Sequence, residues 1–133
     1  FFDSLESELS HMMFSIPAVK GIEFGDGFGL AAMKGSAAND GMRWAEGKVE
    51  TKTNHNGGIL GGISGGNPVI FRLAIKPTAS IGKPQLTVNL AERKDTLLTI
   101  GGRHDPCIIP RAIPVIETAA ALVILDEILV TGD

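Results

Sequence analysis

The residues with the most varied chemistry lie in one short segment, residues 101–107, which reads Gly-Gly-Arg-His-Asp-Pro-Cys. Arg103 offers a planar guanidinium that can bind a carboxylate or a phosphate through two hydrogen bonds. Asp105 offers a carboxylate that can accept or relay a proton. Side chains two positions apart point the same way in an extended segment, so Arg103 could hold an anion while Asp105 does acid–base work. The alternative is a surface ion pair followed by the proline that precedes a helix.

A metal site in this segment is disfavoured. His104, Asp105 and Cys107 do not have the spacing of a zinc site, and the other histidines, His11 and His55, are distant in the sequence. We therefore predict no metal ligand. Cys107 is expected to be a small buried residue at the start of the following helix rather than a nucleophile.

Upstream, residues 53–66 contain three Gly-Gly pairs spaced four residues apart: Gly57-Gly58, Gly61-Gly62 and Gly65-Gly66. A flexible linker is the simplest interpretation, but Ile59, Leu60 and Ile63 fill the gaps, and these are core residues rather than linker residues. We predict an ordered segment that faces a ligand, because a flat or charged group can closely approach a backbone without side chains.

Two known phosphate-binding loops do not account for these glycines. A P-loop requires a lysine after the glycine spacing found at 61–66, and Asn67-Pro68 stands there instead. The glycines at 25, 27 and 29 depart from the dinucleotide-binding pattern because the third one comes too early. His55, between two asparagines, is expected to have only a positioning role or to lie in an Asx turn, since no serine or cysteine partner is identifiable.

A second polar segment, Lys76-Pro77-Thr78-Ala79-Ser80, follows the most convincing strand of the chain. Lys76 supplies a cation, Thr78 and Ser80 supply hydroxyl groups, and Pro77 stiffens the loop. By itself this segment could be an ordinary turn after a strand. Because it follows the glycine pairs closely, it would bring a cation and donors near an open backbone, which suits a phosphate or a carbonyl-rich ring.

The elements that must position these segments follow the order helix, strands, helix. Ser4 or Asp3 can cap a first helix, which Pro17 ends and whose apolar residues recur at 5, 9, 12 and 13. Residues 36–47 are polar and predict a mobile surface loop, with Trp44 as a candidate anchor. The other predicted elements are strands at 18–24, 48–53 and 69–75, a hairpin of 86–90 with 95–100, a short element at 28–33, and a long helix from about 110 to 130.

Most strands are joined by connections of hairpin length, and βαβ alternation is absent from the pattern. We therefore predict an α+β fold in which an antiparallel sheet has helices packed on one face. The chain fits a single domain, residues 1–133. Residues 112–130 have the length of a membrane span but contain Glu117, Asp126 and Glu127, so a buried helix of a soluble protein is the better interpretation.

The composition excludes several classes of partner. Hydrophobic residues make up 44% of the chain and charged residues 20%, which is enough for a packed core. The net charge of -3, without a block of lysines or arginines, disfavours nucleic acid and anionic membranes. A single cysteine cannot form an internal disulfide, so we expect a reducing, cytoplasmic location. The chain starts at Phe1 without a secretory pattern, and we expect it to belong to a longer polypeptide.

The sequence resembles that of chorismate synthases, and the likeness spans nearly the whole chain. Four runs carry it, in the family's order and with family-like gaps. They are Ser15-Ile-Pro-Ala-Val-Lys-Gly21 with Glu23-Phe-Gly-Asp-Gly-Phe28, Thr53-Asn-His-Asn-Gly-Gly-Ile-Leu-Gly-Gly-Ile-Ser-Gly-Gly66, Lys76-Pro-Thr-Ala-Ser80, and Gly102-Arg-His-Asp-Pro-Cys107 with Pro110-Arg-Ala-Ile-Pro-Val115. Together these motifs are highly specific.

The resemblance implies a lyase of the shikimate pathway, which leads to the aromatic amino acids. Such an enzyme converts 5-enolpyruvylshikimate 3-phosphate to chorismate by anti 1,4-elimination of phosphate, and it requires reduced FMN although there is no net redox change. On matching positions, FMN would contact Pro17, Ala18, Gly61, Lys76, Pro77, Thr78, Ala79, Ser80 and Arg103. Asp105 would be the catalytic aspartate that removes the ring proton, and Arg103 would also bind the anionic substrate.

The resemblance also implies what this sequence lacks. Chains of the family are much longer, and their N-terminal part carries two catalytic histidines, several substrate-binding arginines and further FMN contacts. The family fold is a β-α-β sandwich with helices between two antiparallel sheets, usually in a tetramer. This chain would be the C-terminal portion, about half of the sandwich, with an exposed helical face and no activity by itself. The alternative is a non-catalytic binding or assembly module that retains the sheet.

Overall fold

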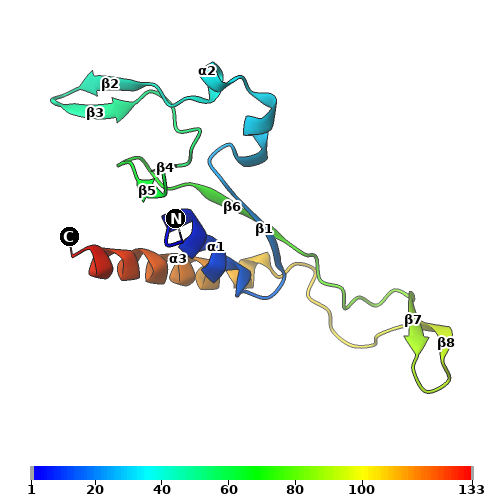
Figure 1. Cartoon of the computed structure of the whole chain (residues 1–133). Helices are drawn as coiled ribbons and strands as arrows, with labels where there is room; N and C mark the ends of the chain where they lie inside the picture. Colours follow the sequence, from blue (N-terminus) through cyan, green and yellow to red (C-terminus); the bar gives the residue numbers. More distant parts are fainter. Residues whose placement is uncertain (1, 133) are drawn as a thin grey trace.

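The computed structural model of the chain describes residues 2–132, in which the N-terminal and C-terminal helices lie below a central pair of strands and hairpins project outward (Figure 1). The elements, in chain order, are α1 (Leu5–Phe14), β1 (Val19–Phe24), the 3-10 helix η1 (Gly27–Ala32), α2 (Gly35–Ala38), β2 (Met42–Ala45), β3 (Lys48–Thr51), β4 (Ile59–Leu60), β5 (Ile63–Ser64), β6 (Phe71–Ile75), β7 (Gln85–Asn89), β8 (Lys94–Leu98) and α3 (Ile109–Thr131). Helices and antiparallel strands are both present, so the predicted α+β class is confirmed.

Helix α1 forms where its capping signal and its apolar spacing predict it. The Ser4 hydroxyl accepts a hydrogen bond from the backbone N–H of Ser7 at 3.2 Å, which caps the first turn. Leu5, Leu9 and Met13 recur on one face and are buried. The helix ends at Phe14, before Pro17.

The pair formed by β1 and β6 is the centre of the fold, and α1 and α3 lie together on one side of it (Figure 1). The strands run antiparallel with Phe24 opposite Phe71, and the register shifts by one residue between Val19 and Gly21. The buried core beneath this pair joins α1, β4 and α3 through Leu5, Leu9, Ile59 and Val123. The helices therefore cover one face, as predicted.

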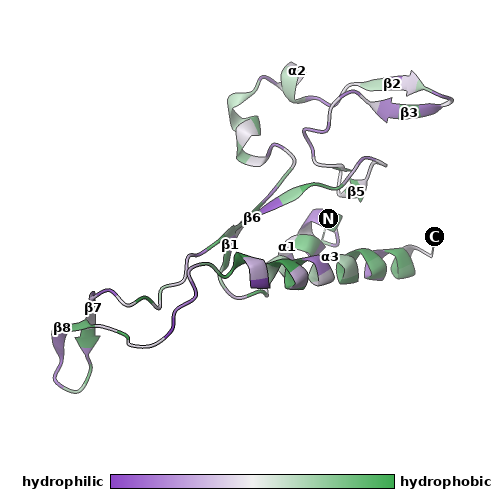
Figure 2. Cartoon of the chain, turned by 180° about the vertical axis from the view of Figure 1, so that it is seen from behind, coloured by the Kyte–Doolittle hydropathy of each residue, from purple (hydrophilic) through white to green (hydrophobic). Residues whose placement is uncertain are grey.

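The strands of the described chain form four separate antiparallel pairs, not one continuous sheet: β1 with β6, β2 with β3, β4 with β5, and β7 with β8. The predicted hairpin at the C-terminal side is confirmed as β7–β8, with Leu86 opposite Leu97. The hairpins β2–β3 and β7–β8 project from opposite ends of the molecule (Figures 1 and 2). Two-stranded hairpins that stand alone are only marginally stable in water.

The prediction of a mobile loop at 36–47 is wrong. Helix α2 and strand β2 lie there, and β2 pairs with β3 through a tight turn in which Glu46 and Gly47 both have positive φ. Trp44 does not anchor the segment, because its side chain is 75% exposed on β2. Glu46 and Gly47 adopt the backbone conformation of a tight hairpin turn, and this favours a pair of strands even though the segment is polar.

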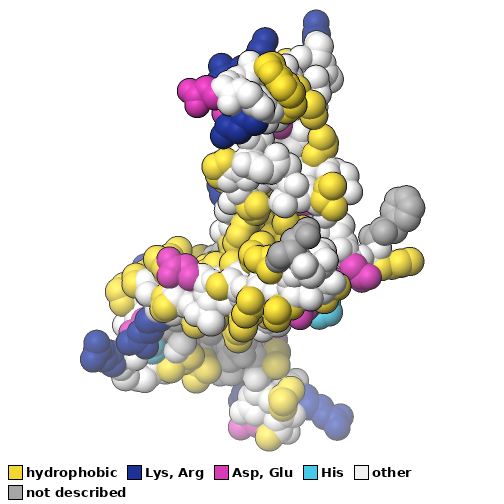
Figure 3. All heavy atoms as spheres, turned by 90° about the vertical axis from the view of Figure 1, so that its left-hand side faces the viewer, with side chains coloured by type: hydrophobic (Ala, Val, Ile, Leu, Met, Phe, Trp, Pro, Cys, Tyr) yellow, Lys and Arg dark blue, Asp and Glu magenta, His cyan; other side chains and the backbone are white. Residues whose placement is uncertain are grey.

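The prediction that α3 is a buried helix is also wrong within the described residues. Only Ala119 and Val123 are buried, whereas large apolar residues are exposed along the helix: Ile113, Val115, Leu122, Leu125, Ile128, Leu129 and Val130. Figure 2 shows hydrophobic residues along the whole length of α3. In the space-filling view, hydrophobic side chains are visible both on the projecting hairpin and on the helical layer (Figure 3). An apolar helical face therefore remains uncovered, and none of the described helices has an apolar stretch sufficient to cross a bilayer.

Candidate functional site

The glycine segment of residues 57–66 is ordered and folds back on itself. Strands β4 and β5 pair with Leu60 opposite Ile63, and the turn between them is Gly61-Gly62. Both turn glycines have positive φ, 63° and 88°, which matches the two-residue turn that glycine favours in hairpins. The prediction of an ordered segment rather than a linker is therefore confirmed.

Three glycines of this segment pack closely against other parts of the same chain. A Cβ built on Gly57 would lie 2.3 Å from the backbone nitrogen of Gly25, and one on Gly58 would lie 2.5 Å from the carbonyl oxygen of Pro68. At Gly62 the neighbour is the Cβ of Ser4, at 2.8 Å. The prediction that the bare backbone serves a ligand is thus wrong at these three positions, where it serves internal packing. At Gly61, in contrast, a Cβ would meet no described atom within 4 Å.

Asp40 organises the turn that precedes these glycines. Its Oδ1 accepts hydrogen bonds from the Thr53 hydroxyl at 2.7 Å and the His55 N–H at 2.8 Å. Its Oδ2 accepts from the backbone N–H and the side-chain amide of Asn56, at 3.0 and 2.9 Å. Burial raises the pKa of Asp40, but these hydrogen bonds outweigh it and lower the pKa to about 2. Sequence reasoning missed this residue. The only available signal was that the backbone N–H groups of His55 and Asn56, in the predicted Asx turn, would need an acceptor.

His55 is held by Asp26. The Asp26 N–H donates to the carbonyl oxygen of His55 at 2.9 Å, and the imidazole Nδ1 lies 2.5 Å from the Asp26 carboxylate. The two contacts join the turn after β1 to the turn before β4. Within this chain His55 therefore positions the backbone, in agreement with the role expected from the sequence.

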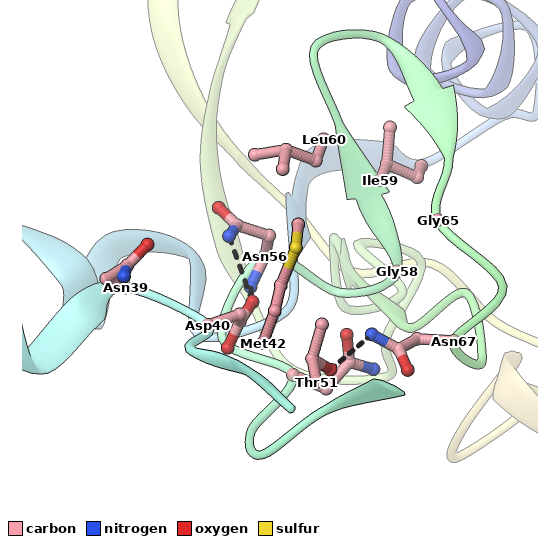
Figure 4. Close-up of a pocket in the computed structure, with 11 residues that line it drawn as sticks. Asn39, Asp40, Met42, Thr51, Asn56, Gly58, Ile59, Leu60, Gly65 and Asn67 are labelled. Atoms are coloured by element: carbon pink, nitrogen blue, oxygen red, sulfur yellow. Dashed lines mark hydrogen bonds between the residues drawn. The ribbon is translucent and has the colours of Figure 1, made fainter. Parts of the chain in front are cut away.

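A cavity of about 270 Å³ opens between the base of the β2–β3 hairpin and the glycine segment (Figure 4). Its lining combines polar and apolar side chains with glycine backbone: Asn39, Asp40, Met42, Thr51, Asn54, Asn56, Gly58, Ile59, Leu60, Gly65 and Asn67. Asn67 donates to the Thr51 hydroxyl at 2.6 Å. The buried Oδ1 of Asn54 has no hydrogen-bond partner in the part of the chain that the structure describes.

The predicted residues Pro17, Ala18 and Lys76 come together at one end of the β1–β6 pair. The Lys76 N–H donates to the carbonyl oxygen of Ala18 at 2.7 Å. Ala18 has a φ of 71°, which is rare for a residue with a Cβ. In the following loop the Thr78 hydroxyl is buried without a partner among residues 2–132. This end of the pair therefore offers a cation and an unsatisfied hydroxyl.

His104 links the loop after β6 to the segment before α3. Its Nε2 forms a hydrogen bond with the carbonyl oxygen of Ile100 at 3.0 Å, so this nitrogen carries the proton. In the neutral ring Nδ1 is then an acceptor, and it lies 3.3 Å from the Ser80 hydroxyl. The two chemistry-bearing segments that the sequence singled out, 76–80 and 101–107, are thus adjacent in space.

Asp105 pairs with a residue that sequence reasoning did not single out. Its Oδ2 lies 2.9 Å from Nη1 of Arg111, in the first turn of α3. Arg103 is exposed and forms no ion pair with the described residues, so an Arg103–Asp105 surface pair does not form here. Cys107 is exposed, and the expectation that it is buried is therefore wrong.

Gly61 does not join the other predicted site residues within this chain. It lies beside the start of α1, where the Leu5 N–H donates to the carbonyl oxygen of Gly62 at 2.9 Å. Pro17 and Ala18 follow the other end of the same helix. Ten helical residues span about 15 Å, so a single ligand touching both groups would have to reach along α1.

Comparisons with known proteins give a consistent answer. A family model described as chorismate synthase matches residues 1–129. The chain is 50% identical over 128 residues to a chorismate synthase of Korarchaeum cryptofilum and 52% identical over 131 residues to one of Methanosarcina acetivorans. These alignments cover 96% and 98% of this chain but 36% of each relative, so the chain spans about a third of their length.

A crystal structure of a chorismate synthase is similar in fold, with a TM-score of 0.55 at 37% sequence identity. The match covers 58% of this chain and 23% of that one. The likeness is therefore present in the fold as well as in the sequence.

Proposed function

The chain belongs to the chorismate synthase family, and from this premise we propose that it is the C-terminal part of an FMN-dependent lyase. The reaction is the anti 1,4-elimination of phosphate from 5-enolpyruvylshikimate 3-phosphate, which gives chorismate. A C–H bond of the ring breaks and its electron pair forms a new ring double bond. The existing ring double bond shifts by one position, and the bonding pair of the C–O bond leaves with the phosphate. The observation that carries the proposal is the match of the family model to residues 1–129.

Two observations support a flavin site at the proposed residues. The Thr78 hydroxyl is buried without a partner among the described residues, so it can form a hydrogen bond with a phosphate oxygen. Gly61 has space where a side chain would lie. We propose that FMN is held by Pro17, Ala18, Gly61, Lys76, Pro77, Thr78, Ala79, Ser80 and Arg103. Reduced FMN would supply electron density to the substrate transiently.

Asp105 is the proposed catalytic residue, and its task is to take the ring proton. Its side chain is 32% exposed, so a substrate can approach it. Arg103 is exposed two residues away and is the proposed binding group for the anionic substrate. The hydrogen bond between Ser80 and His104 supports this arrangement, because it holds the proposed cofactor loop against the segment that carries both residues.

The proposed partners follow from the length of the chain and from its surface. The chain spans 36% of its relatives, and the other part of the family polypeptide would supply the remaining catalytic and binding groups. A groove of about 510 Å³ between α1 and α3 is lined by mostly apolar residues, including Met12, Val115 and Leu122. Such an uncovered face suits burial against the rest of the polypeptide or in a homotetramer. We propose a cytoplasmic enzyme.

Two assays test this function, one with the chain alone and one with the N-terminal part of a relative added. The purified chain is supplied with reduced FMN and substrate, and phosphate and chorismate are measured; no turnover is expected. The assay is then repeated with the N-terminal part of a relative, such as that of Methanosarcina acetivorans, and turnover is expected. If neither mixture is active while both parts are folded and associated, the non-catalytic assembly module stands instead. The exposed apolar face of α3 is the observation that favours this second candidate.

A further inference from the structure

The segment that carries Asp105 has no regular secondary structure, so something else must set the direction of its carboxylate. Between β8 and α3 the backbone has bends but no helix, strand or turn. The one side-chain partner of Asp105 within the described residues is Arg111, with 2.9 Å between Oδ2 and Nη1. The other carboxylate oxygen, Oδ1, has no such partner in residues 2–132. One oxygen is therefore held and the other is open.

Arg111 is well placed to hold this carboxylate because it belongs to a rigid element. It lies in the first turn of the 23-residue helix α3, and its backbone N–H donates to the carbonyl oxygen of Ile108 at 3.0 Å. The helix contributes Ala119 and Val123 to the buried interior. The ion pair thus ties a residue of an irregular segment to an element whose position the core sets.

The helix itself gains nothing from an arginine at this position. A cation in the first turn opposes the helix dipole, and no acidic residue of α3 lies in that turn. The Asp105 carboxylate supplies the missing negative charge from outside the helix. An ion pair as exposed as this one contributes little to folding stability, so its effect on the direction of the carboxylate is measured through turnover rather than through unfolding.

We propose that Arg111 is a positioning residue of the elimination, which holds Oδ2 of Asp105 so that Oδ1 faces the ring proton. This inference depends on the proposed function. In the step, the ring C–H bond breaks and the proton bonds to Oδ1. The C–H electron pair forms a new ring double bond, the existing ring double bond shifts, and the C–O bonding pair departs with the phosphate. Arg111 itself touches neither the substrate nor the flavin.

The test uses a polypeptide of family length that includes this chain. Arg111→Ala is expected to lower kcat about ten- to a hundredfold, the effect of a misplaced catalytic group, and to leave the Kd for FMN within about twofold. Arg111→Lys should recover part of the loss because it restores the charge. Arg43→Ala is the matched control: Arg43 also forms an exposed ion pair, with Glu50 at 3.3 Å, but on the distant hairpin. It should leave kcat unchanged.

A double-mutant cycle decides whether Arg111 acts through Asp105. In the Asp105→Asn background, Arg111→Ala should reduce the residual turnover no further. A further tenfold loss there, or an unchanged kcat in Arg111→Ala alone, would overturn the inference and leave the proposed function intact.

A measurement that does not depend on turnover tests the Arg111–Asp105 contact independently of the proposed function. The ¹⁵Nη–¹H resonance of Arg111 should exchange slowly with water in the wild-type protein and quickly in Asp105→Asn, because Nη1 is the atom in contact with Oδ2. If that contact is present but the wild-type protein never forms chorismate, the proposed function fails while the ion pair stands. If exchange is fast in both proteins, the positioning contact does not form and the inference fails.

Discussion

Gly25 and Gly57 lie so close together that neither tolerates a side chain. A Cβ on Gly25 would lie 2.4 Å from the backbone nitrogen of Gly57, and one on Gly57 would lie 2.3 Å from the nitrogen of Gly25. Both residues hydrogen-bond to Ile70: the Gly25 N–H donates to the Ile70 carbonyl oxygen at 2.9 Å, and the Ile70 N–H donates to the Gly57 carbonyl oxygen at 3.0 Å. This three-way contact joins the end of β1, the glycine segment and the start of β6.

Gly57→Ala is therefore expected to destabilise the fold by about 3 kcal/mol or more, from a backbone clash and from a positive φ of 66°. Gly66→Ala has a φ of 81° and open space among the described atoms, so it should cost only about 1 kcal/mol. Gly29→Ala has neither problem and should change stability by less than about 0.5 kcal/mol. Urea unfolding measures all three, and equal effects for the first two variants would contradict the close contact.

The acid stability of the chain should depend on Asp40. Its pKa in the folded protein is lowered from 3.8 to about 2, so its stabilising effect is complete above about pH 4 and is lost as the pH falls towards 2. The effect should be about 1 kcal/mol, since water screens a partly exposed carboxylate. Asp40→Asn should remove this part of the pH dependence in thermal unfolding between pH 2 and 5. An identical pH profile for both proteins would exclude the role of the four hydrogen bonds.

Asp105→Asn, in a polypeptide of family length, is expected to lower kcat about a hundred- to ten-thousandfold, the usual contribution of a general base. FMN affinity should be unchanged, because the substitution preserves the shape of the side chain. Chorismate formation and flavin fluorescence measure the two quantities. Wild-type turnover in the variant would remove Asp105 from the mechanism.

Lys76→Ala should weaken FMN binding about tenfold, the effect of one lost charge-assisted hydrogen bond. Fluorescence titration with FMN gives the Kd. Lys52→Ala is the control, since Lys52 is exposed and directly follows β3 of the projecting β2–β3 hairpin (Figure 1). Equal Kd values for Lys76→Ala and the wild-type protein would place the flavin elsewhere.

The apolar face of α3 should matter for association. Leu122 is 54% exposed and lines the groove between α1 and α3. Leu122→Asp is expected to weaken binding to the N-terminal part of the enzyme at least tenfold, because a charge would be buried in an apolar contact. Glu117→Gln, also exposed on α3, should have little effect. Titration calorimetry measures both, and tight binding by Leu122→Asp would exclude this face as the contact.

Local chemistry was enough to predict several elements of this protein. The Ser4 cap and the spacing of Leu5, Leu9 and Met13 predicted α1, because capping and helical periodicity depend on neighbours within one or two turns. The β7–β8 hairpin followed from alternation and a polar turn for the same reason. The two chemistry-bearing segments were also recognised, and the contact between Ser80 and His104 brings them together. The ligand contacts assigned to them stay predictions.

The sequence by itself determined α1, α3, the β7–β8 hairpin, the family and the residues capable of chemistry, because each of these depends on residue types at short spacing. Only the tertiary structure decided which partners those residues have. Asp40 binds residues 13 to 16 positions away, Gly57 packs on Gly25, and Asp105 pairs with Arg111 rather than with Arg103. Such contacts depend on how segments that are distant in the sequence pack around the core. The number of residues between two positions does not determine how close they lie in space.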